Sequence, residues 1–334
     1  MLNIKNMKKR VFSGARATGR LHLGNYLGMV KGCIELQERG DMDCIYCVVD
    51  LHAITTPYNK DTLQQSVRNV VLDYLGAGID PKKSHIIIQS DLRAEHLELA
   101  YYFATIFPVS RTEDLPTYKE KKSQYPDYVN IGLLYYPILM AADIALYKAE
   151  QIPVGDDQEP HLEYAREVVR KFNLMFGQTF PEPKRYATPG HYVPSLLGTG
   201  KMSKTVEGSS INLSDDLEEI KAKLAKVPTD SGKGDRFPDF GPAANLLTFV
   251  ELFEGRDRAQ QYRQEYKVSG IKYQAVKEEL AQAIFKELKP IQERRKIFEN
   301  DPKLVDAILE EGRVYAKTIA DETLREIREK MGLK

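Results

Sequence analysis

The chain has 334 residues, and this length predicts about two domains rather than one small core. Hydrophobic residues make up 42% and charged residues 29%, a composition typical of a soluble globular protein. No stretch has the apolar length of a membrane span, and the N-terminal segment lacks the apolar core of a signal peptide. Lysine and arginine together number 48, as do aspartate and glutamate, and this charge balance argues against a protein devoted to non-specific nucleic-acid binding. Because the sequence shows neither a membrane span nor a signal peptide, we expect a cytoplasmic protein without a membrane partner.

The first half of the chain alternates short apolar runs with helical patterns. Runs at residues 11–12, 44–49 and 85–89 predict buried strands, because each is followed by polar residues or by glycine and proline. Between the last two runs, apolar residues recur at helical spacing, and we expect Gly76 and Pro81 to close that helix. This alternation predicts an α/β fold with a Rossmann-like parallel sheet, whose ligands lie beyond the carboxyl ends of the strands.

Strand signals end near residue 215. Asp215 lies three residues before Glu218 and predicts a helix capping box. Residues 246–253, 273–288 and 304–331 also predict helices. We therefore expect a catalytic domain at residues 1–214 and an all-helical region at residues 215–334, whose last helix could pack back on the catalytic domain.

The cysteines predict neither a disulfide framework nor a metal site. Cys44 and Cys47 form a C-x-x-C within an expected strand, and residues three apart on a strand face opposite sides of the sheet. We expect both to pack in the core.

Two glycine-containing segments could bind phosphate. In VFSGARATGRLHLGNYLG (residues 11–28), glycines lie at a strand–helix corner, and the helix N-terminus offers free N–H groups with His22 beside them. In LLGTGKMSKTVEG (residues 196–208), Lys201 and Lys204 lie in a loop where they could stabilise the charge of a leaving pyrophosphate. Taken singly, the first segment is equally well explained as a packing corner, and the second is better explained as a solvated loop with two surface lysines.

Together the two segments resemble the HIGH and KMSKS signatures of class I aminoacyl-tRNA synthetases. Residues 22–25 (HLGN) match the first signature and residues 201–205 (KMSKT) the second. The intervening segments VVDLHAITTP, GLLYYPILMAADIALY and VGDDQEPHLEYAREVVRKFN are similar to those of bacterial tryptophanyl-tRNA synthetases. The resemblance covers nearly the whole chain.

The resemblance implies a tryptophan pocket built around Asp143. Because the indole N–H can only donate a hydrogen bond, the pocket needs an acceptor inside an apolar box. Asp143 lies among apolar neighbours, with Met140 one helical turn earlier, and in the family the matching aspartate receives the indole N–H. By resemblance, the tryptophan-binding residues are Phe12, Gly14, His52, Tyr136, Met140, Asp143, Ile152, Val154 and Gln158.

The resemblance also implies an ATP site. It gives Asp157 contact with the ribose and Lys121 contact with a phosphate. The implied catalytic residues are His22, Asn25, Lys201 and Lys204. The implied ATP-binding residues are Ala15, Arg16, Ala17, Gly24, Asn25, Lys121, Gly155, Asp156, Asp157, Lys201, Met202, Ser203, Lys204 and Thr205. Two residues depart from the family pattern, since Ala17 stands where proline is usual and Thr205 replaces the final serine of KMSKS.

The implied activity has two steps. ATP activates L-tryptophan to tryptophanyl-adenylate, with Mg²⁺ held by the phosphates, and the tryptophanyl group is then transferred to the 3′ end of tRNA(Trp). The helical region would read the anticodon, and family members work as homodimers.

Three alternatives remain open from the sequence: a tyrosyl-tRNA synthetase, a small-molecule adenylyltransferase, and an inactive paralogue that binds RNA. The other histidines have no assigned role. His161 lies one helical turn beyond Gln158 and could serve in packing, and we expect His85, His96 and His191 to be structural or surface residues.

Overall fold

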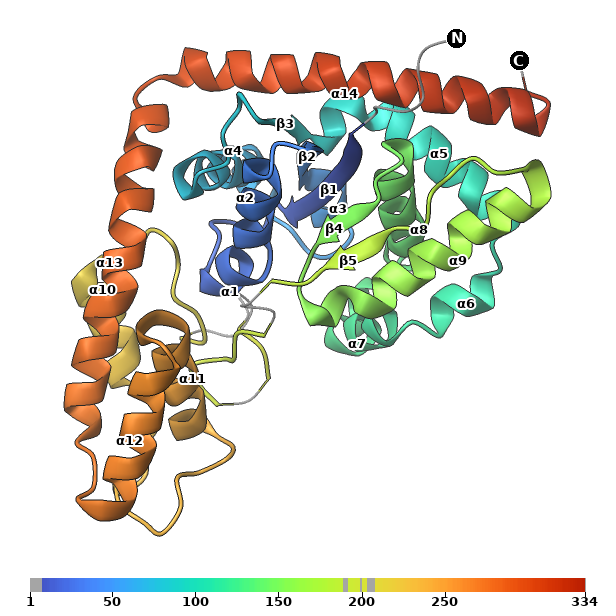
Figure 1. Ribbon diagram of the computed structural model, residues 1–334. Helices are drawn as coiled ribbons and strands as arrows, with labels where there is room; N and C mark the ends of the chain where they lie inside the picture. Colours follow the sequence, from blue (N-terminus) through green and yellow to red (C-terminus); the bar gives the residue numbers. More distant parts are fainter. Residues whose placement is uncertain (1–7, 189–191, 199, 203–207, 334) are drawn as a thin grey trace.

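The centre of the molecule is a five-stranded parallel sheet (Figure 1). The computed structural model describes residues 8–188, 192–198, 200–202 and 208–333. The strands lie in the order β3-β2-β1-β4-β5. Their bounds are β1 Lys9–Arg16, β2 Met42–Val49, β3 Ser84–Ile88, β4 Gln151–Pro153 and β5 Lys184–Tyr186. The three predicted strands are confirmed, whereas β4 and β5 were not predicted because each has only three residues.

The sheet separates two hydrophobic cores. Along β2, Cys44 packs in one core and Cys47 in the other, so the C-x-x-C pair faces opposite sides of the sheet as predicted. Both thiols are buried and free. β1 lies at the centre of the sheet, between β2 and β4. β2 and β3 are added on one side of β1, and β4 and β5 on the other, so the strand order reverses at β1. In parallel sheets such a switch point opens a crevice at the carboxyl ends of the strands.

Helices α2 and α4 cover one face of the sheet, and α13 packs on α4 from outside. The first helix after β1 is interrupted, with α1 at Leu23–Asn25, a π-helical turn at Tyr26–Val30 and α2 at Lys31–Glu38. α4 spans Lys60–Ala77 and ends at Gly78, whose φ of +113° favours glycine. The prediction that Gly76 closes α4 was therefore wrong. Gly76 lies inside the helix because a Cβ there would approach Cβ of Arg295 in α13 to 2.8 Å.

Helices α5 (Arg93–Ile106), α8 (Ile131–Leu146), α9 (Glu159–Phe176) and α14 (Pro302–Met331) build the core on the other face. α14 runs along the sheet edge beside β3 and reaches α5 and α8 (Figure 1). Its Gly312 lies so close to β3 that a Cβ would be 2.2 Å from the carbonyl oxygen of Ile86. The shorter elements are α3 Asp50–Ala53, α6 Val109–Glu113, α7 Pro116–Gln124, and the 3-10 turns Gln89–Leu92, Pro126–Tyr128 and Asp156–Gln158.

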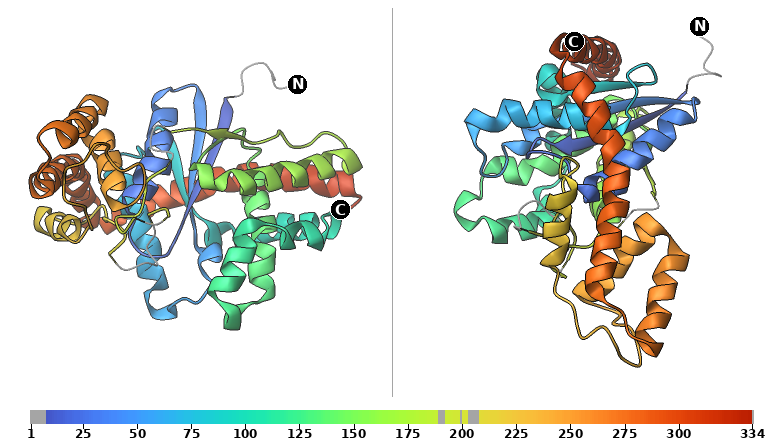
Figure 2. Two further views of the ribbon diagram at one scale, coloured as in Figure 1. Left: turned by 90° about the horizontal axis from the view of Figure 1, so that it is seen from below. Right: turned by 90° about the vertical axis from the view of Figure 1, so that its left-hand side faces the viewer.

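The part of the chain beyond residue 215 is helical wherever it has regular structure. Its helices are α10 (Leu217–Ala225), α11 (Pro242–Glu254), α12 (Arg256–Val268), α13 (Tyr273–Glu299) and α14. α10, α11, α12 and α13 extend from one side of the sheet, whereas α14 runs back along it (Figure 2). The capping box of α10 is formed by Asp216 and Glu219, one residue later than predicted, because Asp215 instead turns inward and pairs with Lys223. α12 was not predicted, since its sequence RDRAQQYRQEYKV has few apolar residues.

A buried ion pair joins the helical part to the corner after β1. Asp73 of α4 and Arg295 of α13 are 1% and 5% exposed and form a salt bridge. The same carboxylate accepts a hydrogen bond of 2.7 Å from the backbone N–H of Leu21. Within the described ranges, none of the helices combines the length and the apolarity that a membrane crossing requires.

Candidate active site

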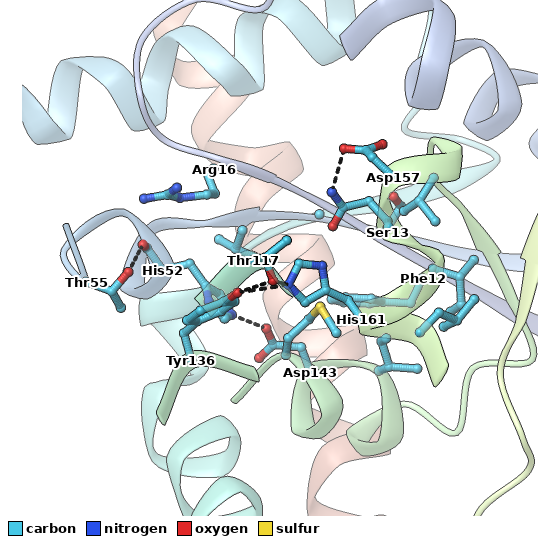
Figure 3. A pocket seen from close by; sticks show the side chains of 18 of the residues that line it. Phe12, Ser13, Arg16, His52, Thr55, Thr117, Tyr136, Asp143, Asp157 and His161 are labelled. Carbon is cyan, nitrogen blue, oxygen red and sulfur yellow. Dashed lines mark hydrogen bonds and ion pairs between the residues drawn. The ribbon is translucent and has the colours of Figure 1, made fainter. Parts of the chain in front are cut away.

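A cavity of about 370 Å³ opens at the carboxyl ends of β1, β2 and β4, at the switch point of the sheet (Figure 3). Its walls come from these strands and from α3, α7, α8 and α9. The lining residues are Phe12, Ser13, Gly14, Arg16, Val49, His52, Thr55, Thr117, Glu120, Lys121, Tyr136, Met140, Asp143, Ile144, Ile152, Val154, Asp157, Gln158, His161 and Leu162. The cavity therefore combines apolar side chains with a few polar groups, as small-molecule sites do.

The inner end of the cavity is apolar apart from one carboxylate. Phe12 on β1 and Ile152 on β4 come from neighbouring strands, and Met140 faces them from α8. Gly14 is required here because a Cβ would come within 2.8 Å of Cγ1 of Val49. These residues form a flat, apolar space between the sheet and α8.

Asp143 supplies that carboxylate, and it is only 1% exposed. Its Oδ2 accepts a hydrogen bond of 2.8 Å from Nε2 of His52. Its Oδ1 accepts hydrogen bonds of 2.8 Å from Gln89 and 2.7 Å from Nδ1 of His96. Burial alone would raise the pKa of Asp143, but the hydrogen bonds from the two histidines lower it to about 2. The group is therefore a fixed, buried anion.

Three polar side chains cluster on the wall beside Asp143 (Figure 3). Nε2 of His161 lies 2.7 Å from Oγ1 of Thr117 and 2.9 Å from the hydroxyl of Tyr136. The two hydroxyls are 2.8 Å apart. Burial lowers the pKa of His161 to about 4, so the ring is neutral at pH 7. This cluster holds the Tyr136 hydroxyl at the cavity wall with hydrogen-bonding capacity for a ligand.

The opposite end of the cavity is cationic. Arg16 and Asp157 lie at this end, away from Asp143 (Figure 3). Arg16 donates a hydrogen bond of 3.0 Å to Thr56, and Lys121 of α7 also lines the cavity. Burial lowers the pKa of Lys121, and the charge of Arg16 lowers it further. The positive charges of Arg16 and Lys121 repel each other, and a bound polyanion would relieve this repulsion.

Lys201 reaches the cavity mouth through an ion pair with Asp157. Burial would raise the pKa of Asp157, but the hydrogen bond and charge of Lys201 keep it below its usual value. Gln158 donates a hydrogen bond of 2.9 Å to the same carboxylate. The segment around residue 201 thus meets the turn after β4.

The corner after β1 packs against the segment around residue 201. His22 caps α1 in a reciprocal box with Asn25, whose side chain accepts from the His22 backbone N–H. A Cβ on Gly24 would lie 2.8 Å from the His22 ring and 3.4 Å from Cβ of Met202. Backbone hydrogen bonds also join Leu23 to Ile211. Residues 22–25 and 201–202, which are far apart in the sequence, are therefore neighbours.

The structure brings together every residue expected at the tryptophan site, since each of them lines the cavity. Of the residues expected at the ATP site, Arg16, Lys121 and Asp157 line the same cavity. Ala15 and Ala17 have side chains buried in the core, which leaves only backbone groups for a ligand. The other described residues of this set lie in the surrounding corner and turns: Gly24, Asn25, Gly155, Asp156, Lys201 and Met202. Ser203, Lys204, Thr205 and also His191 lie outside the described residues.

Sequence reasoning missed several cavity groups. Thr117 and Glu120 of α7 line the cavity, and His161 is part of it rather than mere packing. Gln89 and His96 hold Asp143 from behind. Along the described chain, no group of histidine, cysteine, aspartate and glutamate is arranged to hold a metal ion.

Comparison with known proteins agrees with this geometry. Residues 5–289 match the family model of tRNA synthetases class I (W and Y). The chain is 39% identical to the tryptophan–tRNA ligase of Nostoc sp. over 335 residues, covering 97% of this chain and 98% of that relative.

Two solved structures have the same fold. The tryptophanyl-tRNA synthetase of Mycoplasma pneumoniae has a TM-score of 0.86 at 30% identity, covering 98% of this chain and 99% of that one. The Campylobacter jejuni enzyme, complexed with ADP and tryptophan, has a TM-score of 0.80 at 29% identity, covering 97% and 100%. The chain belongs to the class I tRNA synthetases of the tryptophan and tyrosine family and, within it, to the tryptophan–tRNA ligases.

Proposed function

We propose that this chain activates L-tryptophan with ATP in the cavity described above and transfers it to the 3′ end of tRNA(Trp). The observation that carries the proposal is Asp143, an ionised acceptor at the end of an apolar slot. An indole ring presents one N–H donor on an otherwise apolar body, so this slot complements it. The full-length relatedness to tryptophan–tRNA ligases supports the same assignment.

The tryptophan side chain would lie between Phe12, Met140 and Ile152, with its N–H directed to Asp143. Its ammonium and carboxylate groups would then lie near Tyr136 and Gln158, at the polar wall of the cavity. The neutral His161 ring can accept the Tyr136 hydroxyl proton, which leaves the phenol oxygen as an acceptor for the ammonium group. His52 would close the slot while donating to Asp143.

ATP would occupy the cationic end. Asp157 would accept hydrogen bonds from the ribose, and Arg16 and Lys121 would hold phosphates. Lys201 lies at the mouth, where it could neutralise the departing pyrophosphate together with Lys204.

The first step needs no protein nucleophile. The tryptophan carboxylate attacks the α-phosphorus and pyrophosphate leaves, so catalysis rests on alignment and on charge stabilisation. His22 and the N–H groups of the corner after β1 would contribute on the phosphate side. Mg²⁺ would be held by phosphate oxygens and water, a coordination it commonly adopts, and would offset their charge.

The region 215–334 would bind the tRNA. A hollow of about 260 Å³ lies between α11, α12 and the loop before α11, and its polar lining is Arg236, Asp239, Thr248, Gln260, Arg263, Gln264 and Lys267. Phe240 of the same loop is 90% exposed. Guanidinium and amide groups beside an exposed aromatic ring suit an unpaired RNA base, so this hollow is our candidate for contact with the anticodon loop.

This assignment has a direct test. Arg263→Ala should raise the KM for tRNA in aminoacylation by at least about tenfold and leave tryptophan-dependent ATP–pyrophosphate exchange unchanged. Arg325→Ala, an exposed position on α14, is the matched control and should change neither rate. An equal KM for tRNA in the Arg263 and Arg325 variants would show that the hollow does not bind tRNA.

A homodimer is the assembly that we propose. Helices α5 and α8 pack side by side, and both carry exposed apolar side chains, with Leu97 at 43% and Tyr101 at 64% on α5 and Ile131 at 82% on α8. Exposed apolar side chains on adjacent helices are typical of a protein interface. Sedimentation should give the mass of two chains, and Tyr101→Glu should shift it to one. We also propose that the enzyme acts in the cytoplasm.

ATP–pyrophosphate exchange tests the activity as a whole. It should depend on L-tryptophan and be far weaker with L-tyrosine or L-phenylalanine, because a site with one buried acceptor rejects ligands that leave it unpaired. Exchange with tyrosine at the same rate would favour the tyrosyl alternative, and no exchange with any amino acid would favour an inactive paralogue. The chain contains no tryptophan, so the fluorescence of a bound tryptophan ligand can be followed without background from protein indole groups.

A further inference from the structure

Two buried residues contact Asp143 from the side away from the cavity. Gln89 follows β3 and His96 lies in the first turns of α5, and both have exposed fractions of 0%. Gln89 and His96 both reach Oδ1 of Asp143, at 2.8 and 2.7 Å. Neither lines the cavity. They can therefore influence a ligand only indirectly, through Asp143 or, for His96, through Tyr147, which stacks on Phe12.

The direction of each of these hydrogen bonds is fixed by a further partner. Oε1 of Gln89 accepts the backbone N–H of Leu51 at 3.1 Å, so the Gln89 amide nitrogen must face Asp143. Because the Asp143 carboxylate is ionised, Nδ1 of His96 carries the proton between them. Nε2 of His96 then accepts the hydroxyl proton of Tyr147, at 2.8 Å. Burial raises the pKa of Tyr147 well above its usual value, so the phenol keeps that proton.

This arrangement leaves one acceptor position open on Asp143. A carboxylate oxygen has two lone-pair sites, and both sites of Oδ1 are taken by Gln89 and His96. Oδ2 accepts only from His52 among the described residues. Three donors from three different elements, His52, Gln89 and His96, fix the plane of the carboxylate. The second lone pair of Oδ2 therefore has a fixed direction.

We infer that Gln89 and His96 are specificity-determining positioning residues: by occupying Oδ1 they present a single Oδ2 acceptor site to a ligand with one N–H donor. The inference rests on the proposed function, because it takes the indole N–H as that donor. Without these two donors the carboxylate could rotate or turn Oδ1 toward the cavity, and its fit to one donor would be lost. A role only in packing would instead change the shape of the slot for any ligand.

A pair of ligands separates these two roles. L-tryptophan and β-(3-benzothienyl)-L-alanine have nearly the same shape, but a sulfur atom replaces the N–H in the second. Their Kd values, measured by calorimetry, give a discrimination ratio that isolates the hydrogen bond to Asp143. Loss of positioning should weaken tryptophan binding alone, whereas a change in packing should weaken both ligands alike.

The variants are Gln89→Met and His96→Leu, each of which removes one donor at similar volume. The expected result is a fall in the discrimination ratio of about tenfold to a hundredfold, the range for a hydrogen bond to a charged group. His96→Asn keeps an N–H donor close to the position of Nδ1, so its ratio should lie nearer to that of the wild type. Leu99→Ala, a fully buried position on the same helix, is the packing control and should leave the ratio unchanged.

Parallel losses for both ligands, or an unchanged ratio in Gln89→Met and His96→Leu, would overturn the inference. If circular dichroism shows that His96→Leu does not fold, the discrimination ratios of Gln89→Met and His96→Asn test the inference instead. A wild-type enzyme that binds both ligands equally would be a different result, since it would refute the contact between the indole and Asp143 in the proposed function. The two failures are thus distinguishable.

Discussion

Acid should destabilise this protein through His161. The ring is 6% exposed, and burial lowers its pKa from 6.5 to about 4. Since the unfolded chain takes up the proton near pH 6.5 and the folded chain only near pH 4, the unfolded state binds more protons between these values. Stability is therefore complete above pH 6.5 and falls as the pH is lowered toward 4.

The magnitude follows from the difference between the two pKa values. Each pKa unit corresponds to about 1.4 kcal/mol, so the full loss is about 3 kcal/mol, of which about 2 kcal/mol should appear by pH 5. Ionised carboxylates such as Asp143 also stabilise the folded state through their hydrogen bonds and ion pairs. This stabilisation is lost only at lower pH, because the pKa values of carboxylates in the unfolded chain lie near 4.

The assay is urea unfolding followed by circular dichroism at pH 7.5 and pH 5.0. His161→Gln keeps a hydrogen-bonding polar group close to Thr117 and Tyr136 but cannot take up a proton. The variant is expected to be less stable than the wild type at pH 7.5, and its free energy of unfolding should fall by about 2 kcal/mol less between the two pH values. An equal fall in wild type and variant would show that His161 does not carry the acid sensitivity.

Three further substitutions probe other parts of the structure. Arg295→Met removes one partner of a buried ion pair and should cost about 3 to 5 kcal/mol in urea unfolding, whereas a loss below about 1 kcal/mol would show that the pair is hydrated. Gly312→Ala places a Cβ against a β3 carbonyl oxygen and should lower the melting temperature by several degrees, with no change expected if α14 can move outward freely. Lys201→Ala releases Asp157 and should slow ATP–pyrophosphate exchange by about tenfold to a thousandfold with little change in tryptophan Kd; an unchanged exchange rate would argue against a catalytic role for this lysine.

The motif residues could be placed from the sequence because each is read from a local pattern. The helix that carries Met140 and Asp143 is long and apolar, so its position opposite the strands was predictable. The first two predicted strands also fix which residues end at the carboxyl edge, and these residues, Phe12 and Val49, line the cavity. The resemblance supplied the individual assignments.

The residues that sequence reasoning missed depend on packing between distant elements. Gln89 and His96 reach Asp143 across 54 and 47 residues of sequence, and no local signal marks them. Thr117 meets His161 in the same way, across 44 residues. The short strands β4 and β5 lack the length that makes periodicity visible, and their place in the sheet follows only from the pairing of β4 with β1 and of β5 with β4.

The buried ion pair of Asp73 and Arg295 links the corner after β1 to helix α13. Asp73 holds the backbone N–H of Leu21, the residue before the His22 corner, and Arg295 belongs to α13, which runs into the helices proposed to read the tRNA. Gly76 lets α4 and α13 approach closely at the same crossing. A shift of α13 would have to separate two buried charges, at a cost of about 3 to 5 kcal/mol. We therefore expect the corner after β1 and α13 to move together, so adjustments on the proposed tRNA binding should fall in α11, α12 and the loop before them rather than at this crossing.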